Sequence, residues 1–160
     1  MEQDNSLVEG NKPQPAPVQP SAEKVAVAEE VIGLLGMITR RRADIQISSE
    51  DISVLARDKA NPVLNTDAEF VRNNERRISV LEEVIRDNED AIIKATARLI
   101  DLANIDNAEC LAAVEIFEQR MNSDGNGTGI SVARQFEVVF QNSASGASID
   151  LKAVVDEILE

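Results

Sequence analysis

Apolar residues recur at alternating intervals of three and four between positions 71 and 102, and this repeat constrains the fold more than any other feature of the chain. It is the a/d pattern of a coiled coil, sustained over about five heptads. The positions of the repeat are Val71, Asn74, Ile78, Leu81, Ile85, Asn88, Ile92, Ala95, Leu99 and Leu102. Thr66 and Glu69 have the spacing of a capping box, which predicts where the helix begins. We therefore predict a long helix from residue 66, in which Asn74 and Asn88 fix the register or the number of partners.

A second helix is predicted directly after the first. Asp106 and Glu109 form another capping box, and the apolar face that follows extends to Met121. Because only residues 104–106 separate the two helices, we expect an antiparallel hairpin within residues 63–121. This hairpin is the expected oligomerisation domain, a coiled-coil core for a homo-oligomer. The residues predicted to lie between subunits are Val71, Asn74, Ile78, Leu81, Ile85, Asn88, Ile92, Leu99 and Leu102.

The first 62 residues divide into a tail and a small helical unit. Prolines at positions 13, 15, 17 and 20 favour an extended chain, so residues 1–21 are expected to be disordered. Ser21 can cap a helix that runs to about residue 43, and Ser48 or Ser49 can cap a second helix that Pro62 ends. Residues 22–62 are therefore predicted to form a unit like a helix-turn-helix.

A β-strand is predicted near the C-terminus, within a linker-and-strand segment that spans residues 122–148. Between residues 130 and 141 apolar and polar side chains alternate, which is the period of a strand. The chain contains no convincing second strand, so we expect this one to pair with the same strand of other copies. The apolar face of the predicted intersubunit strand comprises Val132, Phe136, Val138 and Phe140.

A short amphipathic helix is predicted over residues 149–160. Its apolar face includes Leu151, Val155 and Ile158, and we expect this face to bind a partner protein. The fold class that we predict is therefore mainly α. It consists of the helix-turn-helix-like unit, the long central hairpin, one strand that pairs between subunits, and the terminal helix.

The composition excludes several classes of function. The 160-residue chain has 16 Lys plus Arg against 29 Asp plus Glu, a formal net charge of −13, and no His. Catalytic triads and metal sites that need imidazole are therefore excluded, and no glycine-rich phosphate loop is present. Cys110 is the only cysteine, so a disulfide framework is excluded and a reduced, intracellular setting is expected. We expect no catalysis, no cofactor, no metal ion and no contact with a membrane.

Two local motifs have competing interpretations. Residues 124–129 resemble the start of a calcium loop, but the twelfth position is Gln135 instead of Glu, so we interpret the segment as a linker. A basic group on the first helices is the candidate DNA-binding site. Its members are Arg40, Arg41, Arg42, Arg57 and Lys59. The alternative is that these charges match the helix dipole and cover a solvated face.

Residues 67–74, DAEFVRNN, resemble the segment that opens the central helical hairpin in the terminase small subunits of contractile-tailed bacteriophages. Residues 107–121 are similar in outline to the second helix of that hairpin. The resemblance covers about residues 66–121, and the first hairpin helix is longer here by roughly two turns. The order of the segments is also similar, with a variable N-terminal region before the hairpin and a strand-containing segment after it.

This resemblance implies a ring-forming, non-catalytic subunit of a viral DNA-packaging machine in the host cell cytoplasm. Such a subunit recognises double-stranded viral DNA and regulates the ATPase and nuclease of the terminase large subunit. The terminal helix would then face that large subunit. The alternative is a structural or scaffolding virion protein, or a coiled-coil adaptor, that does not bind DNA.

Overall fold

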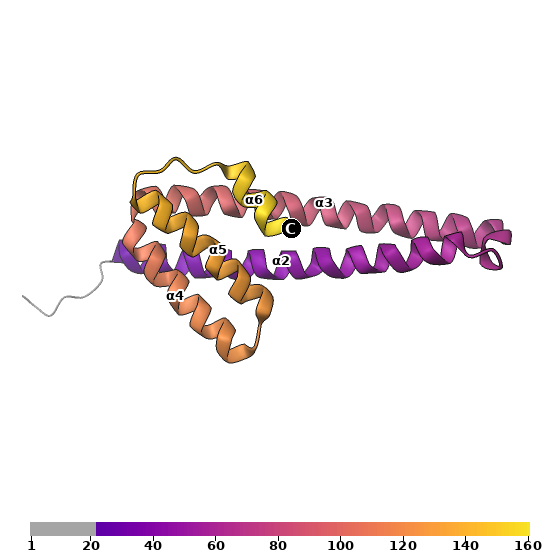
Figure 1. Ribbon diagram of the computed structural model, residues 1–160, viewed down its shortest axis with the longest axis horizontal. Coiled ribbons are helices and arrows are strands. Elements are labelled where there is room, and N and C mark those ends of the chain that lie inside the picture. The colour runs from indigo at the N-terminus through magenta and orange to yellow at the C-terminus, as the bar shows by residue number, and fades with distance from the viewer. Residues whose placement is uncertain (1–21) are drawn as a thin grey trace, which may run out of the picture.

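The computed structural model describes residues 22–160, which form helices joined by short connections (Figure 1). The mainly helical fold is confirmed, and no β-strand occurs within this range. The predicted N-terminal tail lies outside the described residues. The elements are α2 (Ala22–Ala60), a 3₁₀ turn η1 (Leu64–Thr66), α3 (Ala68–Ile105), α4 (Asn107–Asp124), α5 (Gly127–Ala144) and α6 (Leu151–Leu159).

The first helix is continuous, so the prediction of a helix-turn-helix-like unit is wrong. The expected connector at residues 44–48 is helical, and Ser48 is buried in the middle of α2 instead of capping a new helix. The reason is a second heptad repeat that runs through the expected connector without a helix breaker. Its positions are Val27, Val31, Leu34, Ile38, Arg41, Ile45, Ser48, Ile52, Leu55 and Lys59.

The two long helices, α2 and α3, lie antiparallel and side by side (Figure 1). Polar contacts join them at three levels. Arg98 Nε lies 2.7 Å from Glu30 Oε2, Arg41 Nη1 donates to Asn88 Oδ1 at 3.0 Å, and Lys59 Nζ lies 3.5 Å from Glu75 Oε1. These contacts set one register along the whole hairpin, with the α2 repeat facing the α3 repeat.

The hairpin partner of α3 is therefore α2, which corrects the prediction that it pairs mainly with the helix after it. The α3 repeat packs within its own chain instead of between subunits. Five of the residues predicted to lie between subunits are buried, namely Asn74, Asn88, Ile92, Leu99 and Leu102. The other four are half-buried, namely Val71, Ile78, Leu81 and Ile85. The α3 cap is Asp67, one residue after the predicted Thr66, and it accepts from the backbone N–H groups of Glu69 and Phe70.

Helices α4 and α5 form a second hairpin that packs across the N-terminal half of α2 (Figure 1). Asp106 caps α4 as predicted, by accepting from the backbone N–H of Glu109 at 3.2 Å. The turn to α5 uses Gly125, whose φ of +67° suits glycine, and Asn126, which caps α5. A Cβ at Gly129 would collide with Met121, so glycine is needed where the two helices approach closely.

The predicted intersubunit strand is wrong, because residues 130–141 lie within α5. Val132, Phe136 and Phe140 are four residues apart, a spacing that fits a helix face as well as a strand face. Val138 separates the two interpretations, since a strand would bury it beside Phe136, whereas it is 54% exposed. A helix also satisfies its own backbone hydrogen bonds, so it needs no partner strand from another copy.

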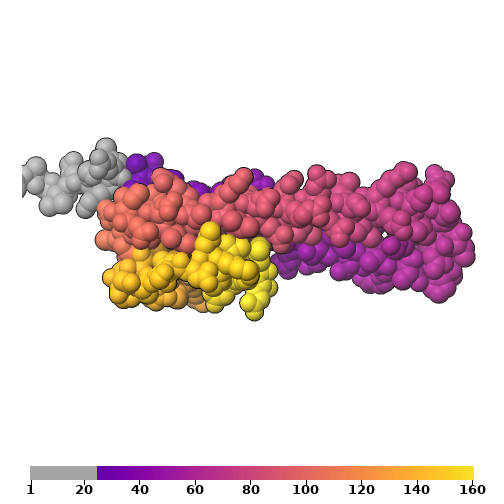
Figure 2. Space-filling model, turned by 90° about the horizontal axis from the view of Figure 1, so that it is seen from above, coloured from indigo at the N-terminus to yellow at the C-terminus, as the bar shows by residue number. Residues whose placement is uncertain are grey.

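The core lies at one end of the molecule, where the first half of α2 and the second half of α3 meet α4, α5 and α6. Its largest fully buried side chains are Phe136, Phe140, Leu35, Ile38, Ile92, Leu99, Leu102, Ile158, Val31, Val114 and Val132. Figure 2 shows the C-terminal helices along one side of α3 only, over part of its length. None of the helices between residues 22 and 160 is both long enough and apolar enough to cross a bilayer.

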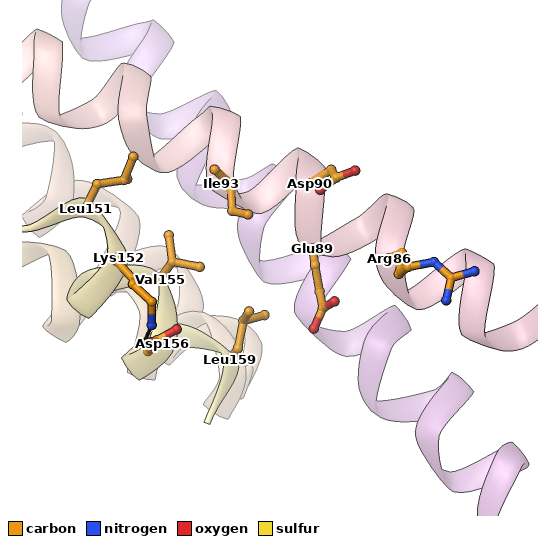
Figure 3. A pocket seen from close by; sticks show the side chains of 9 residues that line it. All are labelled: Arg86, Glu89, Asp90, Ile93, Leu151, Lys152, Val155, Asp156 and Leu159. Atoms are coloured by element: carbon orange, nitrogen blue, oxygen red, sulfur yellow. Dashed lines mark hydrogen bonds and ion pairs between the residues drawn. The ribbon is translucent and has the colours of Figure 1, made fainter.

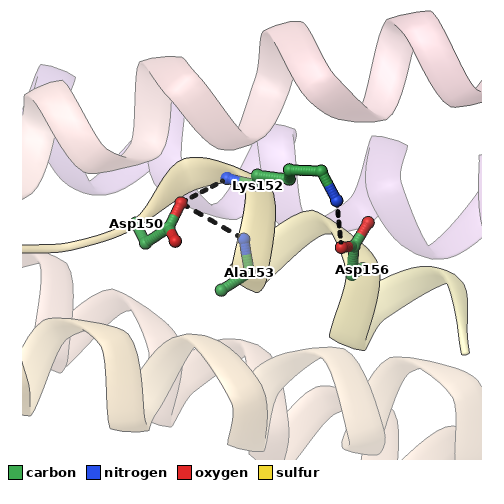
Figure 4. Close-up of polar contacts among 4 residues, drawn as sticks. All are labelled: Asp150, Lys152, Ala153 and Asp156. Atoms are coloured by element: carbon green, nitrogen blue, oxygen red, sulfur yellow. Dashed lines mark hydrogen bonds and ion pairs between the residues drawn. The ribbon is translucent and has the colours of Figure 1, made fainter.

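Helix α6 returns along α3 after a connection over residues 145–150. Asp150 caps it by accepting from the backbone N–H groups of Lys152 and Ala153, and Lys152 Nζ donates to Asp156 at 2.8 Å (Figure 4). Val154, Val155 and Ile158 are buried against the rest of the chain. Of the three residues predicted to bind a partner, Val155 and Ile158 are thus used internally, and Leu151 is half-buried.

Substitution of Val138 tests the helix at residues 127–144. We expect Val138→Pro to lower the free energy of unfolding by about 3 kcal/mol and to reduce helical content, because proline removes a helix hydrogen bond and clashes with the preceding turn. Val138→Ala is the matched control and should be nearly neutral at this exposed position. Circular dichroism and urea unfolding measure both. Unchanged helicity and stability in the proline variant would contradict the assignment of α5.

The two seam asparagines differ in their partners, which gives a second prediction. Asn88 accepts from Arg41, whereas the buried Nδ2 of Asn74 has no hydrogen-bond partner within residues 22–160. We expect Asn88→Ala to cost about 1–2 kcal/mol and Asn74→Ala to be close to neutral, since removal of an unpaired buried amide offsets the lost packing. Urea unfolding compares them. Equal costs would show that the bond between Arg41 and Asn88 contributes nothing.

Candidate functional site: the distal helical hairpin

We define the distal hairpin as residues 44–85, the part of α2 and α3 that extends beyond α4, α5 and α6 (Figures 1 and 2). In the core the seam residues of α3 are fully buried, as Ile92 and Leu99 are. In the distal hairpin Ile78, Leu81 and Ile85 are only half-buried. Two helices alone cannot enclose their own seam, so this part of the molecule leaves apolar surface accessible.

One flank of the distal hairpin collects exposed apolar side chains from both helices. Heptad spacing from the pair Glu30–Arg98 identifies this flank, because residues 7, 14 or 21 positions further along each helix lie on the same side. Asp44 and Asp51 follow from Glu30, and Val84 and Arg77 follow from Arg98. The apolar flank, as we name it, comprises Ile47 (57% exposed), Val54 (47%), Val80 (60%) and Val84 (39%).

The opposite flank has a different character. It is the side that α4, α5 and α6 cover in the core, where Arg42 Nη1 lies 3.5 Å from Ser131 Oγ of α5. Within the distal hairpin this side is uncovered and polar. Its exposed residues are Gln46, Ser49, Ser53, Glu75, Ser79 and Glu82. The two flanks of the distal hairpin are therefore chemically unequal.

The predicted DNA-binding residues do not form one patch. Arg40, Arg41 and Arg42 lie in the middle of α2, and Arg57 is about 25 Å further along at 1.5 Å per residue. Arg41 contacts Asn88, and Lys59 pairs with Glu75. Two members of the group, Arg40 and Arg57, are exposed.

The antiparallel register brings Arg57 to the same end of the hairpin as three exposed arginines of α3, which are Arg72, Arg76 and Arg77. Sequence reasoning missed this grouping, because it treated α3 only as an acidic coiled coil and gave α2 no long-range partner. Carboxylates lie among these arginines. The acidic residues of the same end are Asp58, Asp67, Glu69 and Glu75. The tip is therefore mixed in charge, so any contact with phosphate would depend on individual arginines.

A groove of about 440 Å³ lies between α3 and α6 (Figure 3). Apolar side chains of Ile93, Val155 and Leu159 line it, and charged groups of Arg86 and Glu89 stand at its edge. Leu151 also lines the groove, so part of the predicted partner-binding face remains accessible there. The arrangement can receive apolar side chains of another protein, and its lining contains no nucleophile paired with a base.

Groups for metal or nucleophilic chemistry are not assembled in the described part of the chain. Among residues 22–160 no cluster of three or more Cys, Asp or Glu side chains could hold a metal ion. The segment like a calcium loop is the turn between α4 and α5. Cys110 is fully buried, and desolvation, with smaller contributions from Asp106 and Glu109, raises the pKa of its thiol to about 11. A thiol in this state is a packing group instead of a nucleophile.

Comparison with known proteins adds no relative. No protein-family model matches the chain, and neither the curated proteins nor the solved structures contain a match. The case for a function therefore depends on the chain's own residues and their arrangement.

The buried thiol predicts how stability changes at alkaline pH. The unfolded thiol ionises near pH 9, whereas the folded thiol stays neutral until about pH 11. Unfolding therefore releases a proton between these values, and we expect a loss of about 2–3 kcal/mol as the pH rises from 9 to 11. Urea unfolding of the wild type and of Cys110→Ala measures this contribution. An identical pH dependence in both would contradict the shifted pKa.

Proposed function

We propose that this protein is a non-catalytic, self-associating subunit of a viral DNA-packaging terminase, of the small-subunit type. The observation that carries the proposal is the distal hairpin, a projecting pair of helices that leaves apolar side chains accessible on one flank. Exposed apolar surface of this kind is typical of a protein–protein interface. The segment that resembles terminase small subunits, residues 67–74, begins α3 within this same hairpin.

Self-association would also give the protein a way to bind DNA despite its net charge of −13. A single copy offers few exposed arginines among many carboxylates, so its affinity for phosphate is expected to be low. Several copies in one assembly, a closed ring in the form that the resemblance implies, would present the same arginines repeatedly. Linked weak contacts of this kind raise the overall affinity by orders of magnitude.

The large subunit of the terminase is the proposed protein partner, and the host cell cytoplasm is the proposed location. The groove between α3 and α6 supports a protein partner, because it combines apolar walls with charged edges near the C-terminus. In this proposal the chain supplies recognition and assembly, while the ATPase and nuclease steps belong to the large subunit.

A second candidate is a structural or scaffolding virion protein, or a coiled-coil adaptor, that does not contact DNA. The observation that favours it is the dispersion of the basic residues along α2, where Arg41 and Lys59 already have partners within the chain. Self-association is common to both candidates, so duplex binding separates them.

Charge reversal tests the DNA-packaging proposal. We expect the wild type to bind duplex DNA with a steep dependence on salt. Arg40→Glu combined with Arg57→Glu should weaken binding at least tenfold, and the salt slope should fall by roughly one for each lost phosphate contact. Fluorescence anisotropy over a range of salt concentrations measures both effects.

The matched control is Lys94→Glu combined with Arg120→Glu, which makes the same change in net charge at exposed positions elsewhere. This control should bind as the wild type does. If the wild type does not bind duplex at low salt, the second candidate is favoured. If both double variants lose the same affinity, the effect is one of overall charge and not of a site.

A further inference from the structure

We infer that the apolar flank pairs with the same flank of a second copy about a two-fold axis parallel to the hairpin, with both tips at the same end. This inference rests on the proposed self-association and specifies its surface and symmetry. The occupant of the flank is thus a second copy of this chain, and the product is a four-helix bundle made from two distal hairpins.

The inequality of the two flanks selects the kind of symmetry. In a head-to-tail assembly the apolar flank of each copy would contact the opposite, polar flank of the next. Val54 and Val80 would then face Ser53, Ser79 and Glu82, an arrangement that leaves polar groups to be desolvated. When the flank contacts its own equivalent, the four apolar side chains of each copy meet. A self-complementary patch of this kind gives a two-fold dimer.

Charge selects the direction of the axis. On the apolar flank the edge of α2 is acidic, with Asp44, Asp51 and Asp58, whereas α3 carries Arg77. An axis that placed α2 on its own equivalent would bring these carboxylates together. An axis parallel to the hairpin instead places α2 on α3 of the other copy, with all levels preserved.

Two ion pairs follow from this arrangement. Asp51 and Arg77 lie at one level, 21 residues from Glu30 and Arg98 respectively, so Asp51 faces Arg77 of the partner subunit. Positions 40 and 87 also lie at one level, because Arg41 bonds to Asn88. Asp87, an acidic residue on the α3 edge, therefore faces Arg40 of the partner subunit.

The size of the contact sets the expected strength. The flank from Asp44 to Asp58 is about 20 Å long at 1.5 Å per residue, and two helices of about 10 Å diameter give it a width near 20 Å. Each copy would cover roughly 400–600 Å², so the total lies near the lower limit of stable interfaces. We therefore expect a dimer that dissociates at micromolar concentrations, and that repeats elsewhere on the chain could join into larger assemblies.

Sedimentation equilibrium of the full chain tests the surface. We expect Val80→Asp to raise the dissociation constant of the dimer at least tenfold, because it places a carboxylate in the apolar contact. Ser79→Asp is the matched control, since it adds the same charge to the neighbouring residue on the polar flank. Circular dichroism checks that both variants remain helical. If Ser79→Asp dissociates the protein as strongly as Val80→Asp does, the inference is wrong.

A charge swap tests the axis. Asp51→Arg and Arg77→Asp should each weaken the homodimer, because each places like charges together across both symmetry-related contacts. A mixture of the two variants should form a heterodimer more tightly than either variant self-associates, since every contact is then attractive. Sedimentation of the mixture, with one variant labelled, measures this preference. No preference for the heterodimer would overturn the tips-together arrangement.

The outcomes also separate this inference from the proposed function. A wild type that stays monomeric at high micromolar concentration would overturn both. An oligomer that is unaffected by Val80→Asp would overturn the inference but leave self-association through another surface. An assembly of odd subunit number would exclude pure two-fold pairing in favour of a head-to-tail ring.

Discussion

The packing of the α2 heptad repeat against the α3 repeat is the interaction on which the rest of the structure depends. It occupies the longest continuous apolar stripe of the chain and fixes the register through Glu30–Arg98, Arg41–Asn88 and Lys59–Glu75. Helices α4, α5 and α6 are short by comparison and complete a core on one side of this hairpin. Because the stripe is satisfied within one chain, contacts between copies have to use the flanks of the hairpin.

Uneven covering of the hairpin explains why its two halves differ. At one end α4, α5 and α6 enclose the seam, and residues such as Leu35 and Leu99 are fully buried. At the other end the same two helices continue without cover, so half-buried seam residues adjoin the exposed apolar flank. A chain with four Phe and no Trp or Tyr has few large side chains with which to cover both ends. The proposed association of copies supplies at the distal end what the C-terminal helices supply at the other.

The sequence predicted α3, α4 and α6 well because each combines an apolar period of three to four residues with an Asp cap, at Asp67, Asp106 and Asp150. It did not predict α2 as one helix, although the repeat through Ile45 and Ile52 is present, because serines at 48 and 49 were interpreted as a cap. Residues 130–141 fit both periods, and only tertiary packing decided between them. The candidate site shared this weakness, since the flank is defined by the pairing of α2 with α3, which the local pattern does not specify.

The gradient of burial along the hairpin has a consequence for its dynamics. Amide protons near Leu35 and Leu99 can exchange with solvent only when the core opens, so their protection should approach the global stability. Amide protons near Val54 and Val80 require only local separation of two helices, which costs less free energy. A single helix such as α3 therefore belongs to two cooperative units, one that opens with the whole domain and one that opens alone. Any contact that covers the tip would merge these two units into one.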